Sequence, residues 1–277
     1  MPVKWDLPPE PIPSWLDPAL EVTPQNDAPK PTIDEFIPML VDLCLELGCD
    51  LPQAVGVAAN ALSEVGYQLH YRGNNLGGWK IWKDSAEGYF AKYGRKPRWW
   101  RSQGNKNSGD PPWCYYRAFD SIQQFLSEWI RRFVPKPADL PPVPKRGPDP
   151  HGRYRECGRA FWAHEPWFPL LIAGGYKGEV TKARPQGSIH AHESLKCEVE
   201  EWWAQSRLRQ TIPNETERAA FEVDGAWGAK SIALCRNFEK AHGLPADGKL
   251  DPITLVTLAD VTTMPRYNFA FRPINKS

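Results

Sequence analysis

Apolar residues recur every three or four positions in three stretches of the chain, which is the spacing of one face of an α-helix. Each stretch begins with a residue that can cap a helix, and a glutamate or glutamine stands three positions later. Each is followed by a glycine or a proline, residues that end helices. These patterns predict helices over 33–47, 51–65 and 122–133, capped by Thr32, Asp50 and Ser121.

Two other segments are rich in proline and lack this pattern. Residues 1–31 are predicted to form an extended arm without a helix, and residues 136–150 a stiff linker. Residues 67–115 are rich in glycine, asparagine, tryptophan and tyrosine instead. We interpret residues 67–115 as short strands and loops that form the wall of a cleft.

The C-terminal part of the chain shows two further patterns. Residues 151–211 form an intermediate segment without an assigned role, in which CEVEEWWAQSRL is predicted to be helical. From residue 212 onward, the similar turns VDGAWG and ADGKLD flank a helical stretch, with Gly225 and Gly248 available for positive φ angles. We therefore expect a separate domain over 212–264 and a tail over 265–277.

Charge and hydropathy exclude two kinds of protein. The 277 residues include 34 basic and 33 acidic side chains and no basic block, so the charge gives no support for nucleic-acid binding. No stretch approaches the ~18 apolar residues that span a bilayer. The N-terminus also lacks the charged start and apolar core of a secretory signal peptide. We therefore expect neither membrane insertion nor export by a signal peptide.

The cysteines and histidines do not indicate a metal site. The six cysteines are scattered without CxxC pairs and are most simply reduced thiols, although their even number leaves disulfides open after export. His190 and His192, alternating as on a strand, could combine with His164 or Glu193, but no HExxH motif accompanies them. We expect neither a metal nor another cofactor.

Glu64 is the first candidate for chemistry. It shares a helical face with Val57 and Ala61 and precedes Gly66, so it is expected to point to the core or to the lip of a cleft. Burial and the partial negative charge of the helix C-terminus both disfavour an ionised carboxylate. A carboxyl group kept protonated in this way suits the general acid of a glycosidase. Taken alone, the stretch favours the alternative, a helix-end glutamate in solvent.

Three runs of residues favour the catalytic interpretation of Glu64 over the solvent-exposed one. They are AANALSEVGYQ, NNLGGWKI and YYRAFDSIQQF. Together they resemble the glucosaminidase family of peptidoglycan hydrolases, flagellar-type and autolysin-type enzymes with a lysozyme-like fold. That family shows Ala-Gln-x-x-x-Glu-Ser-x-x-Gly, then Asn-Leu-Phe-Gly-x-Lys, then Phe-Arg-x-Tyr-x-Ser at the start of a helix. The resemblance covers residues 32–135 and departs from the family at Val65, Gly77 and Phe119.

The resemblance implies a mainly α (α+β) fold, with a lysozyme-like catalytic domain over 32–135 that carries a small β-lobe. Glu64 falls on the catalytic acid of the family, and Tyr116 matches the third motif and would support it. Asn75 could equally be a turn residue. Any exposed tryptophans of the β-lobe would stack against the sugar rings of the glycan. The expected substrate-binding residues are Tyr67, Asn75 and Trp79.

The sequence leaves the second carboxylate of a glycosidase open. The family often supplies an acid from its β-lobe, where this chain has Asp84, Glu87 and Asp110. Asp110 lies nearest to the third run and is our candidate, but the two prolines that follow it also suit a turn. A mechanism in which Glu64 is the only acid, assisted by the acetamido group of the substrate, stays open.

The C-terminal run VDGAWGAKSIALCRNFEKAHGLPADGKLDPITLVTL resembles the three-helix peptidoglycan-binding domain of cell-wall hydrolases. The family pattern is Asp-Gly-x-Phe-Gly-x-x-Thr, followed by Gly-Leu-x-x-Asp-Gly and Asp-x-x-Thr. Such domains bind the wall without chemistry of their own. The resemblance implies Asp224, Trp227 and Asp247 as binding residues.

The two resemblances converge on one polymer, peptidoglycan. We expect a peptidoglycan glycoside hydrolase, an N-acetylglucosaminidase or a muramidase, which acts as a phage endolysin or a secreted antibacterial effector. It would be made in the cytoplasm and reach the periplasm or wall through a holin or a secretion system. We expect a monomer, with an immunity or inhibitor protein as a further partner.

The alternative is a non-catalytic peptidoglycan-binding protein on a degenerate glucosaminidase scaffold. The lack of an obvious second carboxylate is its best support. A third class, amidase or peptidase, would need a zinc site or a Cys–His pattern that the sequence does not show.

Overall fold

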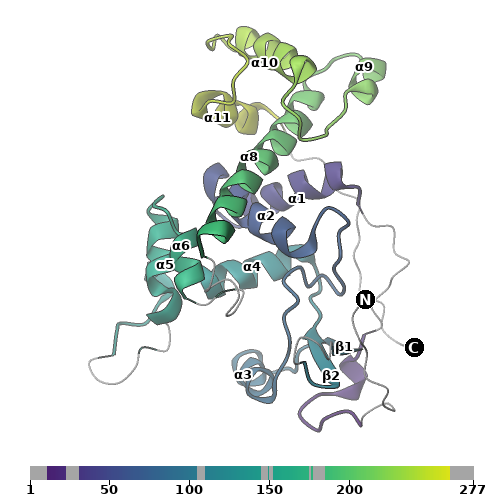
Figure 1. The fold of residues 1–277 in the computed structure, drawn as a ribbon, viewed down its shortest axis with the longest axis vertical. Helices are drawn as coiled ribbons and strands as arrows, with labels where there is room; N and C mark the ends of the chain where they lie inside the picture. The colour runs from purple at the N-terminus through teal and green to yellow at the C-terminus, as the bar shows by residue number, and fades with distance from the viewer. Residues whose placement is uncertain are drawn as a thin grey trace. The chain divides into compact units, whose positions relative to one another are not determined.

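The computed structural model describes residues 11–22, 31–104, 110–144, 149, 152–174, 176 and 185–262. These residues contain ten α-helices and one two-stranded antiparallel sheet (Figure 1). The prediction of a mainly helical protein with a small β-structure is therefore confirmed. The chain divides into two compact units, the first made of Met1–Lys30, Glu64–Phe125 and Phe269–Ser277 and the second of Pro31–Ser63 and Leu126–Asn268.

The three predicted N-terminal helices are confirmed, together with their caps. Asp50 and Gln53 exchange reciprocal hydrogen bonds of 2.9 Å at the start of the second helix, and Ser121 accepts one from the Gln124 N–H at the start of the third. Gly48, with φ at 85°, follows the first helix. The helices are α1 (Ile33–Glu46), α2 (Leu51–Val65) and α4 (Ile122–Phe133).

The first unit contains the sheet that residues 67–115 were expected to form. Strands β1 (Trp99–Gln103) and β2 (Trp113–Arg117) pair antiparallel, and an isolated bridge joins Lys80 to Tyr116. The same region also forms a helix that was not predicted, α3 (Lys83–Tyr93). Only Ala86 of α3 is buried, so this helix lacks the apolar stripe by which helices are found in a sequence.

The expectation of a purely extended N-terminal arm is wrong for residues 11–22. This segment contains a short 3-10 turn at Pro18–Leu20 and packs onto the sheet. Leu16 is buried in a cluster with Trp99, and Val22 donates a backbone hydrogen bond of 2.8 Å to the Trp99 carbonyl. The indole N–H of Trp99 in turn donates to the Asp17 carbonyl at 2.8 Å. Residues 11–22, although rich in proline, therefore pack on the sheet and are hydrogen-bonded to Trp99.

Truncating Leu16 tests this packing. We expect Leu16→Ala to lower the free energy of unfolding of the first unit by about 2–4 kcal/mol, because a buried leucine side chain is replaced by a cavity. Urea unfolding followed by tryptophan fluorescence measures the effect, with the exposed Ala19→Ser as the matched control in the same segment. An unchanged midpoint for Leu16→Ala would show that the segment is detached in solution.

The second unit is built around the long helix α8 (Pro185–Gln210), which packs against α1 (Figure 1). Asp42 of α1 accepts hydrogen bonds from the Arg207 guanidinium at 2.6 Å and from the Trp203 indole at 2.9 Å. All three side chains are buried. Helices α5 (Gly152–Trp162) and α6 (Phe168–Ala173) complete this part of the unit.

The two units differ from the domain ranges expected from the sequence. Residues 31–63 group with 126–268 and not with the rest of 32–135. The segment 151–211, which had no assigned role, supplies α5, α6 and α8 to the second unit. The buried Asp42–Arg207 pair gives the physical reason, because it binds α1 to α8 across a long stretch of sequence.

Removing Asp42 should destabilise the second unit strongly. Asp42→Ala leaves the buried Arg207 charge unpaired, and we expect a loss of about 3–5 kcal/mol in the free energy of unfolding. The double variant Asp42→Leu with Arg207→Leu should recover much of this loss, because no uncompensated charge is left. Thermal unfolding by calorimetry measures both variants. The exposed Glu46→Ala on the same helix serves as control, and a loss of similar size there would contradict the ion-pair account.

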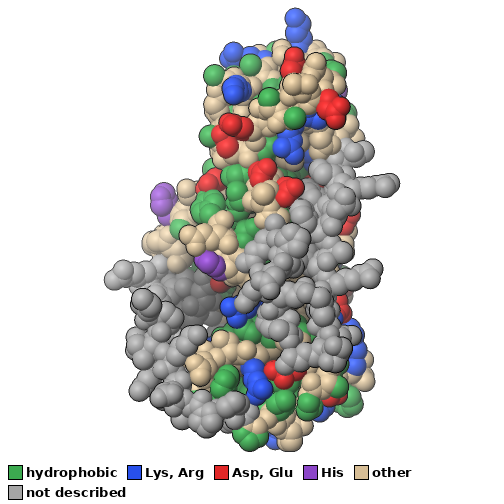
Figure 2. Space-filling model, turned by 90° about the vertical axis from the view of Figure 1, so that its right-hand side faces the viewer, with side chains coloured by type: hydrophobic (Ala, Val, Ile, Leu, Met, Phe, Trp, Pro, Cys, Tyr) green, Lys and Arg blue, Asp and Glu red, His purple; other side chains and the backbone are tan. Residues whose placement is uncertain are grey.

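The C-terminal helices form the last part of the second unit: α9 (Glu215–Ala220), α10 (Ala229–Ala241) and α11 (Pro252–Val261). The prediction of two equivalent turns is confirmed. Asp224 accepts from the Ala226 N–H and Asp247 from the Lys249 N–H, while Gly225 and Gly248 have φ angles of 71° and 78°. Acidic, basic and hydrophobic side chains are mixed over the face of these helices seen in Figure 2.

Candidate functional site

A pocket of about 430 Å³ lies in the first unit beside Glu64. Its wall comes from the end of α2, the loop 66–78, and one residue from each strand of the sheet. Glu64 is exposed, so the structure places it at the lip of a pocket, and the burial that we expected for it is not observed. The lining residues are Glu64, His70, Tyr71, Arg72, Asn75, Leu76, Gly77, Gly78, Trp100 and Tyr116.

The loop 66–78 owes its path to an unusual number of left-handed residues. Leu69 and Asn74 have φ angles of 51° and 54°, which non-glycine residues rarely adopt. Leu69 is buried, and the next N–H, that of His70, donates to the Val65 carbonyl at 2.9 Å. The loop therefore folds back onto the end of α2 and brings His70 to the same pocket as Glu64. The glycines of the loop with positive φ are Gly66, Gly73 and Gly78.

The buried amide of Asn75 holds this loop to the sheet. Its NH₂ group donates to the carbonyls of Trp79 and Arg117, both at 3.0 Å, and its oxygen accepts from the Trp79 N–H at 2.8 Å. The backbone N–H of Asn75 donates to the Arg72 carbonyl at 3.1 Å. Both amide hydrogens are thus used within the protein. Of the two interpretations of Asn75, the structure supports a loop-fixing residue.

Replacing Asn75 separates these two interpretations. We expect Asn75→Ala to lower the free energy of unfolding by about 2–3 kcal/mol without any ligand present, since three hydrogen bonds are lost and buried partners stay unsatisfied. Urea unfolding of the unliganded protein measures the change. Gln68→Ala, an exposed amide on the same loop, is the control. A residue that only contacts sugar would leave the unliganded stability of Asn75→Ala at the level of this control.

Aromatic rings form the wall of the pocket on the side of the sheet. Trp100 and Tyr116 stack with their ring centres 4.3 Å apart and their planes at 11°. The Arg72 guanidinium lies over the Trp100 ring, 5.8 Å from its centre. Val22 packs in the same cluster as Trp100, so the N-terminal segment braces this wall. Burial raises the pKa of Tyr116 to about 12, with Cys114 and Asp110 acting in the same direction, so its hydroxyl is a neutral hydrogen-bond donor.

The remaining predicted residues of the first unit lie outside the pocket lining. Asp110 forms an ion pair of 2.5 Å with Lys80, so this carboxylate has a structural partner. Trp79 is partly buried and packs against Phe119 and Phe125, with its ring centre 5.7 and 5.5 Å from theirs. Tyr67 is 51% exposed. Trp82, at the start of α3, is an exposed tryptophan of this unit, at 57%.

Sequence reasoning missed three residues of the lining, namely His70, Tyr71 and Arg72. Their types carry no motif, and the loop geometry alone brings them together. One usable signal was the run Gly73–Gly78, whose dense glycines and asparagines indicate a tight loop next to Arg72.

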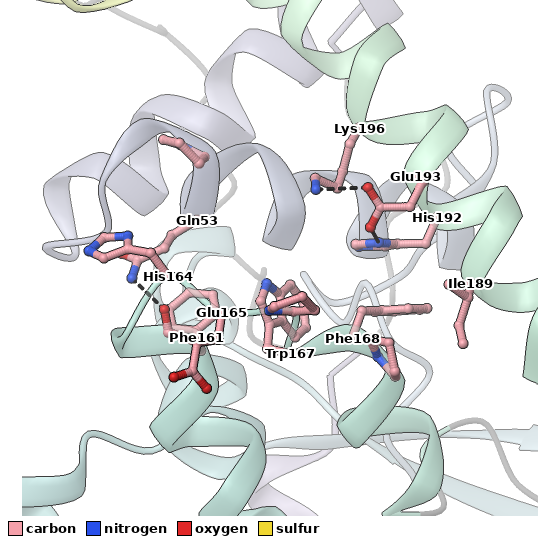
Figure 3. Close-up of a pocket in the computed structure, with 13 residues that line it drawn as sticks. Gln53, Phe161, His164, Glu165, Trp167, Phe168, Ile189, His192, Glu193 and Lys196 are labelled. Carbon is pink, nitrogen blue, oxygen red and sulfur yellow. Dashed lines mark hydrogen bonds and ion pairs between the residues drawn. The ribbon is translucent and has the colours of Figure 1, made fainter. Parts of the chain in front are cut away.

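A second pocket, of about 410 Å³, lies in the second unit between the start of α2, the α5–α6 connection and α8. Figure 3 shows Trp167 and Phe168 on one side of it and His192, Glu193 and Lys196 on the other. The His192 ring stacks on Phe168 with centres 3.7 Å apart, and its Nε2–H donates to the Gly56 carbonyl at 3.0 Å. Burial lowers the pKa of His192 to about 4, so this imidazole is neutral and joins α8 to α2.

His190 and His192, which were considered for a metal site, lie on helix α8 and not on a strand as assumed. His192 is buried while His190, two positions earlier on α8, is exposed, so the two rings do not share a side. His164 pairs with Asp50 at 2.9 Å. Within the part of the chain that the structure describes, no three His, Cys, Asp or Glu side chains are grouped to hold a metal ion.

A third pocket, of about 720 Å³, lies among the C-terminal helices between α9 and α10. Its lining includes Ile212, Phe221, Leu234 and Phe238 and is more apolar than the pocket beside Glu64. Asp224, Trp227 and Asp247, the predicted binding residues, lie outside this lining. They hold turns instead: the Trp227 indole donates to the Gly248 carbonyl at 3.1 Å, and Asp224 accepts from the Gln205 amide at 2.9 Å.

Comparison with known proteins leaves the chain without an assigned family. No protein-family model matches it, and neither a curated protein nor a solved structure shows a significant match. Among the described residues, no helix is long and apolar enough to cross a membrane.

Proposed function

We propose that this protein is a peptidoglycan glycoside hydrolase with a lysozyme-like catalytic region, in which Glu64 is the general acid. The observation that carries the proposal is the position of Glu64 at the lip of a pocket with a stacked aromatic wall. Trp100 is buried, so the partly exposed Tyr116 is the ring of this wall that a sugar could contact. A carboxyl group in the same pocket is placed to reach a glycosidic oxygen. The resemblance of AANALSEVGYQ to the catalytic motif of the glucosaminidases points to the same residue.

In the proposed reaction, the Glu64 carboxyl gives its proton to the oxygen that leaves the anomeric carbon, as that bond breaks. Water then adds to the anomeric carbon and returns a proton to Glu64. Among the residues that the structure describes, the pocket lining contains one carboxylate, that of Glu64. This composition favours assistance by the acetamido group of the substrate over a second protein carboxylate at the ~6.5–9.5 Å spacing of inverting enzymes. Tyr116, neutral and partly buried, would donate a hydrogen bond to the sugar.

We further propose that the C-terminal helices bind the cell wall. The pair of equivalent Asp-Gly turns, with the buried Glu239 accepting from the Gly248 N–H at 2.8 Å, supports the resemblance to peptidoglycan-binding domains. The apolar pocket between α9 and α10 is the best candidate for the contact surface. A tethered wall-binding domain raises the local concentration of substrate for a catalytic pocket that binds weakly.

Loss of the acid tests the proposal. We expect Glu64→Gln to reduce dye release from labelled sacculi by about 100-fold or more, because the amide cannot donate the proton. Glu46→Gln, an exposed glutamate that lines none of the three pockets, should retain the wild-type rate. Equal rates for Glu64→Gln and wild type would remove Glu64 from the mechanism.

The second candidate function is a non-catalytic peptidoglycan-binding protein. Glu64 is the one carboxylate among the described residues of the pocket lining, and it is exposed; both observations favour this candidate. The two candidates differ in one readout. A binder would co-sediment with sacculi and release no fragments, whereas the hydrolase would release fragments whose mass identifies the bond that is cut.

A further inference from the structure

Arg72 is a charged residue of the pocket that neither the sequence motifs nor the proposed mechanism uses. Its side chain is exposed on the lining, and no carboxylate among the described residues lies within ion-pair distance of it. The guanidinium instead rests over Trp100, 5.8 Å from the ring centre. An arginine held against an aromatic face keeps its planar N–H edge available for an anion.

The backbone of Arg72 is held in place more firmly than its exposure suggests. Arg72 and Asn75 form an isolated β-bridge, with the Asn75 N–H on the Arg72 carbonyl at 3.1 Å. Asn75 is in turn fixed to the sheet through its buried amide. Gly73, which follows Arg72, has φ at 56°, a conformation that side-chain-bearing residues rarely adopt, and an added Cβ would crowd Ala118 and Trp100 at 3.2 Å each. The backbone that carries the Arg72 guanidinium is therefore fixed at the edge of the pocket.

We propose that Arg72 binds a carboxylate carried by the substrate and makes the pocket prefer anionic N-acetyl glycans over neutral ones. The inference rests on the proposed glycosidase function of the same pocket. Guanidinium groups bind carboxylates through paired, charge-assisted hydrogen bonds. In peptidoglycan such a carboxylate belongs either to a stem peptide or, where the peptide has been removed, to the lactyl group of the sugar. Chitin, a neutral polymer of N-acetylglucosamine, has neither.

Binding measurements can test this preference apart from catalysis. The full chain with Glu64→Gln binds without cleaving and serves as the background for Arg72→Gln and Arg72→Lys. Isothermal titration would use three soluble oligosaccharides of equal length: peptide-bearing glycan, the same glycan stripped of peptides by an amidase, and chitin oligomer. We expect Arg72→Gln to weaken binding of an anionic glycan by about tenfold more than binding of chitin. Arg72→Lys should recover part of the loss, and added salt should reduce the preference of the background protein.

The pattern of losses identifies the carboxylate. A loss confined to the peptide-bearing glycan assigns it to the stem peptide, and a loss on the stripped glycan assigns it to the lactyl group. Arg95→Gln, which removes an exposed positive charge of the same unit, is the matched control and should not change the preference. An equal effect of Arg72→Gln on all three glycans, or no effect, would overturn the inference. Wild-type protein that cleaves none of them would contradict the proposed function and leave this binding test valid.

Discussion

Three hydrogen bonds from one buried amide fix the loop on which the candidate site depends. The Asn75 side chain ties the loop 66–78 to the backbone of Trp79 and Arg117, and a polar group buried in this way is costly to leave unsatisfied. That loop carries most of the pocket lining and folds back onto the end of α2. Glu64 and the residues around it are thus brought to one pocket by hydrogen bonds that are made entirely within the protein.

The wall of the pocket on the side of the sheet is packed from behind. The stack of Trp100 on Tyr116 is backed by Val22, from the proline-rich N-terminal segment. A segment that looks like a spacer in the sequence therefore contributes to the geometry of the site. The Arg72 guanidinium lies over Trp100 of the same stack, and Glu64 lines the same pocket from the end of α2.

The sequence predicts well those features that local chemistry determines. Helices with an apolar stripe and a capping pair were found with their caps, as were the two Asp-Gly turns. Helix α3 was missed because it is mostly exposed, and the partner of Asp42 was missed because Arg207 lies 165 residues away. In the site, Glu64 could be selected from its motif. Arg72 could not, because only the folded loop brings it to the pocket.

The most direct test is a crystal structure of Glu64→Gln with a bound N-acetyl glycan oligomer. The account predicts that the oligomer lies along the Trp100–Tyr116 wall, with a glycosidic oxygen within about 2.6–3.2 Å of the residue 64 side chain. An oligomer bound only elsewhere, with the pocket beside residue 64 empty at saturating ligand, would contradict the account.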